Sequence, residues 1–379
     1  MEIDYQIIDT MAGLKTIAKI LEKEETIAID LEADSMYHFK EKVCLIQVAT
    51  EKRNIIIDPI RLKDLSPLKP LFFSPDIRKI FHGADYDVRS LYRDFNINIT
   101  HLFDTEVACR FLGLRETGLE TVLNKYFNIH LNKKYQKKDW SKRPLPQEMI
   151  NYAIQDVICL IPLAKILIHE LEKMGRLSWV IEECELLSNV RPVTPDDGPL
   201  FLKFRGAGRL KSRSLAVLEA LLRFRKNIAR KKDRPFFRII GNEALMKIAI
   251  EKPMTLRRLK GSKVLSAKQI NMWGNDIIDI IGHALNLPEN KLPVYPRKKT
   301  PVVPAYITHR AKALKKWRDK KAEDIDIDPG LLCNKALINT IATKNPTYKK
   351  GLAKIQEMKQ WQINELGKDI VTVLRHVKL

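Results

Sequence analysis

Residues 26–32, which read TIAIDLE, have the two-residue alternation of a β-strand, with isoleucine and leucine on one face. The opposite face carries Asp30 and Glu32, and two residues of strand rise separate these carboxylates by about 7 Å along the backbone. Two carboxylates at this separation can ligate neighbouring metal ions spaced about 3.5–4 Å apart. The segment therefore predicts a strand with a possible metal site on one face.

Three further runs have strand character. They read KVCLIQVA at 42–49, NIIID at 54–58 and IRKIFH at 77–82. The first two predict an antiparallel meander beside residues 26–32. The third ends at Gly83, after which a helical pattern begins. Together these runs predict an α/β domain at the start of the chain.

A helix is predicted from about Pro146 onward, where apolar residues recur at helical spacing. Tyr152 and Asp156 are four residues apart and therefore share one face beside the apolar stripe. A carboxylate in that position is costly unless it is paired or binds a metal. A tyrosine titrates near pH ~10, so the neutral phenol of Tyr152 can orient a water but cannot act as a strong base.

The segment between these elements, HGADYD at 82–87, holds two candidate acids. Asp85 stands at the start of the predicted helix and is expected to be its N-cap, because a capping aspartate accepts from free backbone amides. Asp87 is then the expected metal ligand. Carboxylates gathered from all three segments would repel one another and stay partly protonated unless cations joined them. The pattern predicts a metal site suited to phosphodiester chemistry.

The order D-x-E, H-G-A-D-x-D and Y-x-x-x-D resembles the tyrosine branch of the DEDD 3′–5′ exonucleases. Within that superfamily the sequence is similar to the ribonuclease D group and to the related exonuclease of the nuclear exosome. Further blocks agree with this resemblance: DLEADS at 30–35, CLIQ at 44–47, FDT at 103–105 and DWSKRPL at 139–145. A lone D-x-E carries little information, whereas all these blocks in order over about 130 residues are specific.

The resemblance implies a site for two divalent cations, Mg²⁺ or Mn²⁺, held by Asp30, Glu32, Asp87 and Asp156. It also implies that Tyr152 positions the attacking water. One metal would activate that water and the other would stabilise the leaving 3′ oxygen. The implied product is a nucleoside 5′-monophosphate released from the 3′ end of precursor tRNA and similar small structured RNAs.

Three nearby polar residues receive supporting roles. Gln47 and Asp104 are interpreted as structural supports or as groups that contact the ligands. His82 is interpreted as a hydrogen-bonded packing residue instead of a base. None of the three is predicted to bind metal.

The charge distribution points to the substrate. Residues 1–200 contain 27 Lys and Arg against 31 Asp and Glu, whereas residues 201–379 contain 40 against 15. The positive net charge of the chain, +21 in total, therefore comes entirely from its second half. Such asymmetry favours a nucleic-acid partner, because neutralised phosphates release counterions.

Proline-rich stretches at 191–199 and 288–304 divide the chain into three expected domains. The resemblance implies an exonuclease domain at 1–195 with a ribonuclease H-like mixed sheet flanked by helices. Two all-α domains are expected at 206–290 and 303–379. They form a weak internal repeat offset by 93 residues, in which Phe224–Arg225 recurs as Trp317–Arg318. Both resemble the helical domain shared by RecQ-type helicases and ribonuclease D (HRDC).

Basic residues of the first helical domain are predicted to grip the RNA. They are Arg209, Lys211, Arg213, Arg225, Arg230, Lys231 and Lys232. Some of these arginines could instead pair with acids across domain contacts. The five scattered cysteines contain no C-x-x-C pair and indicate neither a zinc site nor a disulfide framework.

The sequence thus predicts a cytoplasmic, metal-dependent 3′–5′ exoribonuclease, with a monomer favoured and no membrane span. A DNA 3′–5′ exonuclease remains an alternative, because the 2′-OH contacts that separate RNA from DNA are not readable from one sequence. A non-catalytic RNA-binding protein with a relic nuclease domain is a second alternative, although none of the five expected site residues is missing.

Overall fold

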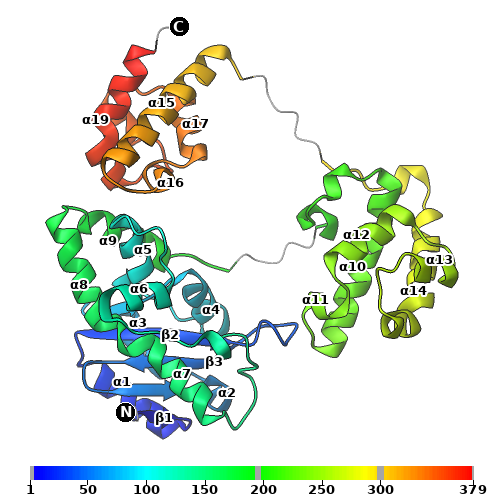
Figure 1. The fold of residues 1–379 in the computed structure, drawn as a ribbon, viewed down its shortest axis with the longest axis horizontal. Helices are drawn as coiled ribbons and strands as arrows, with labels where there is room; N and C mark the ends of the chain where they lie inside the picture. The colour runs from blue at the N-terminus through cyan, green and yellow to red at the C-terminus, as the bar shows by residue number, and fades with distance from the viewer. Residues whose placement is uncertain (1–3, 193–197, 297–302, 378–379) are drawn as a thin grey trace. The chain divides into compact units, whose positions relative to one another are not determined.

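The computed structural model describes residues 4–192, 198–296 and 303–377, which form an α/β domain and two helical domains (Figure 1). By their internal contacts they form two compact units. The first comprises residues 4–33, 43–192 and 303–377, and the second comprises residues 34–42 and 198–296. The expected domain end at residue 195 lies outside the described residues, as do residues 1–3 and 378–379.

The α/β domain is built on a six-stranded mixed sheet of order β1-β4-β3-β2-β5-β6. Its strands are β1 (Gln6–Ile8), β2 (Thr26–Ala33), β3 (Val43–Ala49), β4 (Asn54–Ile57), β5 (Arg78–Phe81) and β6 (Leu102–Asp104). The β2–β3–β4 meander is antiparallel, as predicted, whereas β1 runs parallel to β4, and β5 and β6 run parallel to β2. The two edge strands, β1 and β6, were not predicted.

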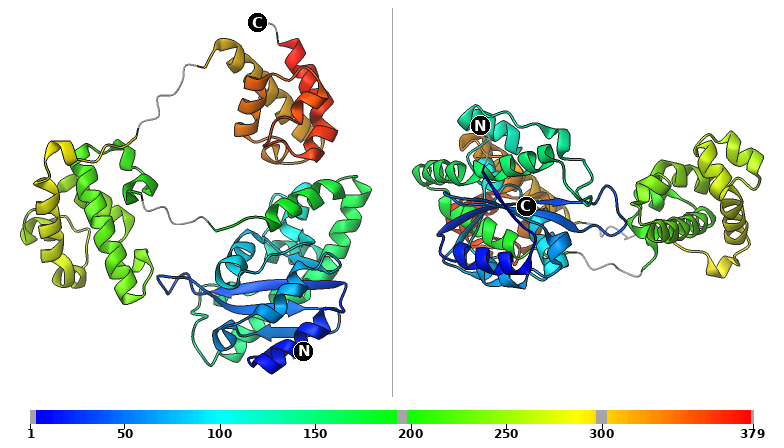
Figure 2. Two further views of the ribbon diagram at one scale, coloured as in Figure 1. Left: turned by 180° about the vertical axis from the view of Figure 1, so that it is seen from behind. Right: turned by 90° about the horizontal axis from the view of Figure 1, so that it is seen from below.

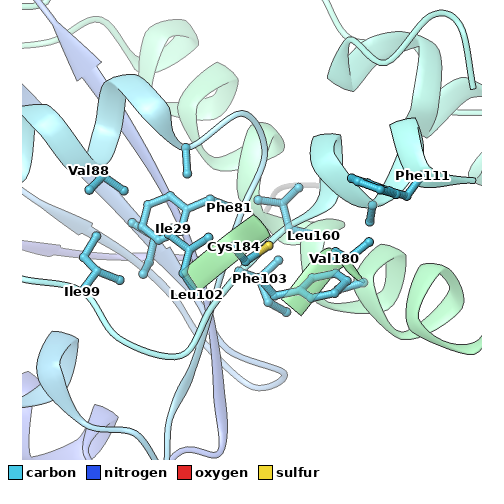
Figure 3. Packing of buried hydrophobic residues seen from close by; sticks show 14 of the residues in the cluster. Ile29, Phe81, Val88, Ile99, Leu102, Phe103, Phe111, Leu160, Val180 and Cys184 are labelled. Carbon is cyan, nitrogen blue, oxygen red and sulfur yellow. The ribbon is translucent and has the colours of Figure 1, made fainter. Parts of the chain in front are cut away.

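Helices cover both faces of this sheet, with α1 on one face and α7 on the other (Figure 2). The helices of four or more residues are α1 (Met11–Leu21), α2 (Pro59–Leu62), α3 (Lys69–Phe73), α4 (Asp85–Phe95), α5 (Thr105–Phe111), α6 (Leu119–Phe127), α7 (Gln147–Ile158), α8 (Leu160–Lys173) and α9 (Leu177–Ser188). Figure 3 shows part of the core, where Phe81 and Phe103 from the strands meet Leu160 of α8 and Val180 of α9.

Helices α7 and α8 follow each other almost without a break. The run Gln147–Lys173 is long and apolar enough to cross a membrane by length and composition alone. Its most apolar window is 56% buried within the protein, and the core helix of a globular domain passes the same test. The run is therefore weak evidence for a membrane span.

The two helical domains have matching element orders. The first contains α10 (Ser212–Lys232), α11 (Phe236–Ile239), α12 (Asn242–Glu251), α13 (Leu256–Gly261) and α14 (Ala267–Leu285). The second contains α15 (Ala305–Asp324), α16 (Pro329–Leu332), α17 (Lys335–Lys344), α18 (Lys349–Leu352) and α19 (Gln360–His376). Both domains keep apolar residues buried at equivalent positions, such as Ala229 and Ala322. The internal repeat predicted from the sequence is thus a structural repeat.

An arginine makes the same contact in both copies. Arg225 of α10 donates to the carbonyl oxygen of Ile240 at 2.9 Å, and Arg318 of α15 donates to that of Cys333 at 2.9 Å. Both pairs keep the offset of 93 residues. Each guanidinium satisfies a backbone acceptor just after a short helix, where the helix itself leaves carbonyl groups unpaired.

A glutamine repeats in the same way. The side-chain amide of Gln269 in α14 donates to Ile239, and that of Gln362 in α19 donates to Leu332, both at 2.8 Å. Each glutamine also caps the start of its own helix by accepting from the backbone of the N-cap residue. In each domain one glutamine side chain therefore connects the first turn of the last helix, α14 or α19, to the short helix α11 or α16.

The second helical domain packs against the α/β domain within the same unit. Glu182 of α9 accepts from the backbone amides of Gln360 and Trp361 at 2.6 and 2.8 Å, which caps the start of α19 from another domain. Glu183 accepts from Nζ of Lys359 at 2.5 Å. Negative charge at a helix N-terminus is favourable because of the helix dipole.

The same interface includes a close backbone approach. A side-chain carbon added to Gly113, whose φ is +85°, would lie 2.4 Å from the carbonyl oxygen of Asp326. Arg176 joins the same region by donating to the carbonyl oxygens of Phe111 and Ile325 at 2.8 and 2.7 Å. Glycine is therefore required at position 113 for both its backbone conformation and its lack of a side chain.

Candidate active site

The structure gathers three of the predicted carboxylates. Asp30 and Glu32 project from β2, and Asp156 projects from α7, which packs across β2 and β3. One carboxylate oxygen from each of the three lies within 4.8 Å of the others. This hard oxygen donor set fits a divalent cation such as Mg²⁺ or Mn²⁺.

Asp87 lies in the first turn of α4 and is buried. It is outside the group of three, yet it is close enough for its charge to raise the pKa of Glu32, and the charge of Asp30 raises its own. The structure therefore places Asp87 beside the cluster as a fourth negative group. Its assignment as a metal ligand remains a prediction.

Burial disfavours the charged form of all four acids, and the charges of neighbouring acids add to this effect for Glu32, Asp87 and Asp156. Loss of solvation raises the pKa of Asp30 to about 6, and loss of solvation together with the charge of Asp30 raises that of Asp156 to about 8. The pKa values of Glu32 and Asp87 rise well above their ordinary range for the same two reasons. Without cations the cluster would therefore hold protons near neutral pH, and bound cations would favour its charged form.

Tyr152 lies one helical turn before Asp156 on α7 and shares a hydrogen bond with its carboxylate. Loss of solvation and then the charge of Asp156 raise the pKa of the phenol far above its ordinary value. The hydroxyl is therefore neutral and can donate or accept a hydrogen bond. Its ring packs against Trp140 and Tyr135, with centroids 6.2 and 6.1 Å away.

Asp30, Glu32, Tyr152 and Asp156 line one pocket of about 370 Å³. Four further residues of this pocket were not singled out from the sequence: Glu106, Glu120, Lys133 and Gln136. Lys133 forms an ion pair with Glu120, in which Nζ lies 2.7 Å from a carboxylate oxygen. The polar run KKYQKK at 133–138 was a readable signal for Lys133 and Gln136, whereas the two glutamates are isolated acids without any pattern.

The prediction that Asp85 caps α4 is wrong. The N-cap position is Ala84, and the carboxylate of Asp85 instead accepts from Arg89 at 2.8 and 2.9 Å. The free amides of Gly83 and Ala84 donate to Asp104 at 2.9 and 2.7 Å. These two amides precede the helix, whose first residue is Asp85 itself, so Asp85 stands one position too late to be the cap and pairs with Arg89 one turn further along.

Asp104 and His82 have the supporting roles expected of them. Asp104 also caps α5 by accepting from the amides of Glu106 and Val107. Nδ1 of His82 is 2.9 Å from the hydroxyl oxygen of Thr105, and burial lowers the pKa of the imidazole. His82 is therefore neutral at pH 7 and is held in place at the edge of the pocket.

The basic residues of the first helical domain fall into separate places. Arg209 and Lys211 are exposed before α10, and Arg230, Lys231 and Lys232 are exposed in its last turn. Helix α10 has 21 residues, so its ends are about 30 Å apart. The basic residues that are close in sequence therefore form two separate surface patches, one before α10 and one at its end.

Two of the predicted arginines have structural roles. Arg213 donates to the carbonyl oxygens of Leu285 and Leu287 at 2.8 and 2.5 Å. The side chain of Arg225 is buried, and burial lowers its pKa to about 10. Its contacts are the carbonyl of Ile240 and the side chain of Asn242. Arg225 belongs to the domain interior, so we exclude it from the surface proposed below.

Comparison with known proteins agrees with this geometry. Residues 5–172 match the 3′-5′ exonuclease family, and residues 214–281 and 308–374 each match the HRDC domain. Ribonuclease D of Gluconacetobacter diazotrophicus is 30% identical over 295 residues, which cover 76% of this chain and 74% of the relative. The solved structure of Escherichia coli RNase D, an exoribonuclease involved in structured RNA processing, is similar over the full length of both chains, with TM-score 0.72 and 25% identity.

Other relatives are longer. Protein RRP6-like 1 of Arabidopsis thaliana is 33% identical over 69% of this chain, but the match spans 44% of that relative. For two more of the curated relatives it spans 27% and 20%. The exonuclease and HRDC segments, the carboxylate pocket with Tyr152, and the similarity over 74% of the Gluconacetobacter diazotrophicus ribonuclease D lead to one assignment. The chain belongs to the ribonuclease D family, whose catalytic domain is a 3′-5′ exonuclease domain.

Proposed function

We propose that this protein is a divalent-metal-dependent 3′–5′ exoribonuclease that trims precursor tRNA and other small structured RNAs in the cytoplasm. The observation that carries the proposal is the pocket in which Asp30, Glu32 and Asp156 converge beside Tyr152. The name of the matched E. coli structure, which describes structured RNA processing, supports the substrate class. We expect the protein to be a monomer.

Two cations bound to Asp30, Glu32, Asp156 and Asp87 would acidify a water and stabilise the leaving 3′ oxygen. The protein's own groups then have distinct tasks. Bound cations would favour the charged form of the carboxylates and so release the protons that burial, and for Asp156 also the charge of Asp30, would otherwise retain. The neutral hydroxyl of Tyr152 orients the attacking water, and the helix that carries Tyr152 also fixes Asp156.

The remaining groups of the chain bind and orient the RNA. Lys133 lies at the pocket wall and can exchange its contact with Glu120 for a phosphate of the 3′ tail. The exposed patches at Arg209 and Lys211 and at 230–232 would hold the body of the RNA. A domain division at 1–195, 206–290 and 303–379 matches this separation of cutting and binding roles.

The decisive experiment uses the full chain with Mg²⁺ or Mn²⁺ and a 5′-labelled hairpin RNA that has a single-stranded 3′ tail. We expect stepwise shortening from the 3′ end, release of 5′-mononucleotides, and a stop near the helix. A DNA hairpin of the same sequence is digested in parallel, and faster cleavage of DNA would overturn the choice of RNA. Activity that persists in an Asp30→Asn/Asp156→Asn variant would overturn the assignment of the site.

A further inference from the structure

Gln47 lies in the middle of β3 and has an unusual environment. Its side chain is fully buried, at 0% exposure. Neither its amide nitrogen nor its amide oxygen has a hydrogen-bond partner among the described residues. Buried polar side-chain atoms in proteins nearly always have a partner, so such a group needs a specific explanation.

The position of Gln47 supplies that explanation. In the antiparallel pairing of β2 and β3, Gln47 is directly opposite Asp30. Directly opposed residues share a face of the sheet, with Cβ atoms about 4.5–5.5 Å apart. On its other side Gln47 is opposite Ile56 of β4, which has no polar side-chain atom. The polar partner that the sheet offers to Gln47 is therefore the carboxylate of Asp30.

The fold itself gains nothing from this amide. The residues around it on the same face, including Leu45 and Ile56, belong to an apolar cluster beneath α7. A leucine of similar volume would fill the site without a desolvated polar group. A polar residue that costs stability at such a place is typical of a group kept for function.

We propose that Gln47 is a positioning residue for the metal site. Its amide nitrogen, which bonds directly to no described residue, donates through one buried water to the Asp30 carboxylate oxygen that does not bind the cation. This contact fixes the orientation of the carboxylate and favours its charged form, as supporting partners of metal ligands do. The inference rests on the proposed function, because it requires a divalent cation at Asp30.

The test compares Gln47→Leu with the wild-type chain in two measurements. Melting of the metal-free protein in EDTA reports the structural role, and calorimetric titration with Mn²⁺ reports cation affinity. We expect a melting temperature equal to or higher than that of the wild type, together with Mn²⁺ affinity weakened by about 10–100-fold. Gln47→Met provides a second apolar side chain of similar length in case the branched leucine does not fit.

The matched control is Ile56→Val, which alters the neighbour of Gln47 on the opposite side from Asp30. It should lower the melting temperature by a few degrees, because it removes a buried methyl group, and leave Mn²⁺ affinity unchanged. Unchanged Mn²⁺ affinity in both Gln47 variants would overturn the inference while leaving the proposed function intact. A wild-type chain that binds no Mn²⁺ would overturn both.

Discussion

Trp179 of α9 and Trp361 of α19 stack face to face, with ring centroids 4.8 Å apart and planes 16° apart. They are separated in sequence by the whole first helical domain and most of the second, yet both are buried in one hydrophobic cluster. Phe111 completes the group by meeting both indoles edge-on, at 6.2 and 5.6 Å. The indole nitrogen of Trp361 donates to Glu183 at 3.0 Å.

We expect Trp361→Ala to destabilise the exonuclease domain although the residue lies in the second HRDC domain. Truncation of a buried tryptophan typically costs about 3–5 kcal/mol. Chemical denaturation of the full chain measures this. Tyr348→Ala is the control, since Tyr348 is 55% exposed in the same domain and its loss should cost less than about 0.5 kcal/mol. Equal costs for the two variants would contradict the packing described.

The carboxylate cluster predicts the pH dependence of stability in EDTA. The folded-state pKa of Asp156 is raised to about 8, so folding takes up a proton wherever the unfolded chain is already ionised. This group's contribution is complete below the unfolded pKa near 4 and is lost as pH rises through about 8.

Asp156→Asn removes that dependence. We expect the variant to gain stability relative to the wild type as pH rises from 5 to 8, by at most about 1.4 kcal/mol per pH unit. Denaturation curves at each pH, with EDTA throughout, measure the difference in the free energy of unfolding between the variant and the wild type. If this difference stayed constant or became smaller as pH rises, it would contradict the raised pKa of Asp156. Saturating Mn²⁺ should remove the effect in the wild type, because the cations compensate the charges.

Tyr152→Phe tests the role of the phenol hydroxyl. We expect kcat to fall about 100-fold, because the attacking water loses its orienting group, with little change in KM or in melting temperature. Single-turnover kinetics on a labelled single-stranded RNA measure the step directly. Tyr135→Phe is the control, as it removes a hydroxyl from a ring packed against Tyr152 and should leave kcat unchanged.

The basic patch at the end of α10 is tested through salt dependence. Replacing Arg230, Lys231 and Lys232 by Ala should weaken binding of a tRNA precursor and reduce the slope of log K against log salt by about 2. Cleavage of a short unstructured oligonucleotide should remain. Lys15→Ala/Lys19→Ala removes exposed charges from α1 and is the control. An unchanged slope in the triple variant would exclude this patch from the RNA interface.

The sequence predicted the central strands well because each contains either an alternating pattern, as in β2, or a run of apolar residues, as in β3 and β4. Residues 26–32 were predicted and β2 spans Thr26–Ala33; residues 54–58 were predicted and β4 spans Asn54–Ile57. The edge strands β1 and β6 have three residues each, which is too short for a period to be visible. Their place in the sheet depends on pairing with β4 and β5, which no local pattern records.

The site residues were predicted from motif order, while their partners were not. Asp85 has the composition of a cap, but the helix begins one residue earlier than expected, and the carboxylate of Asp85 pairs with Arg89. Arg225 has the composition of a surface residue, but its guanidinium satisfies a carbonyl in the interior. Residue composition alone gives neither the exact first residue of the helix nor the contact of Arg225, which lies 15 residues further along the chain.

The shared core of the α/β domain and the second HRDC domain has a consequence for cooperativity. Three modules are visible in the sequence, but the contacts of Glu182, Glu183 and Trp361 join two of them into one thermodynamic unit. Calorimetry should therefore resolve two melting transitions, with the last 70 or so residues melting together with the first 190. Deleting the second HRDC domain would then expose an apolar surface of the nuclease domain around Trp179 and Phe111. The second HRDC domain is therefore a structural part of the catalytic unit.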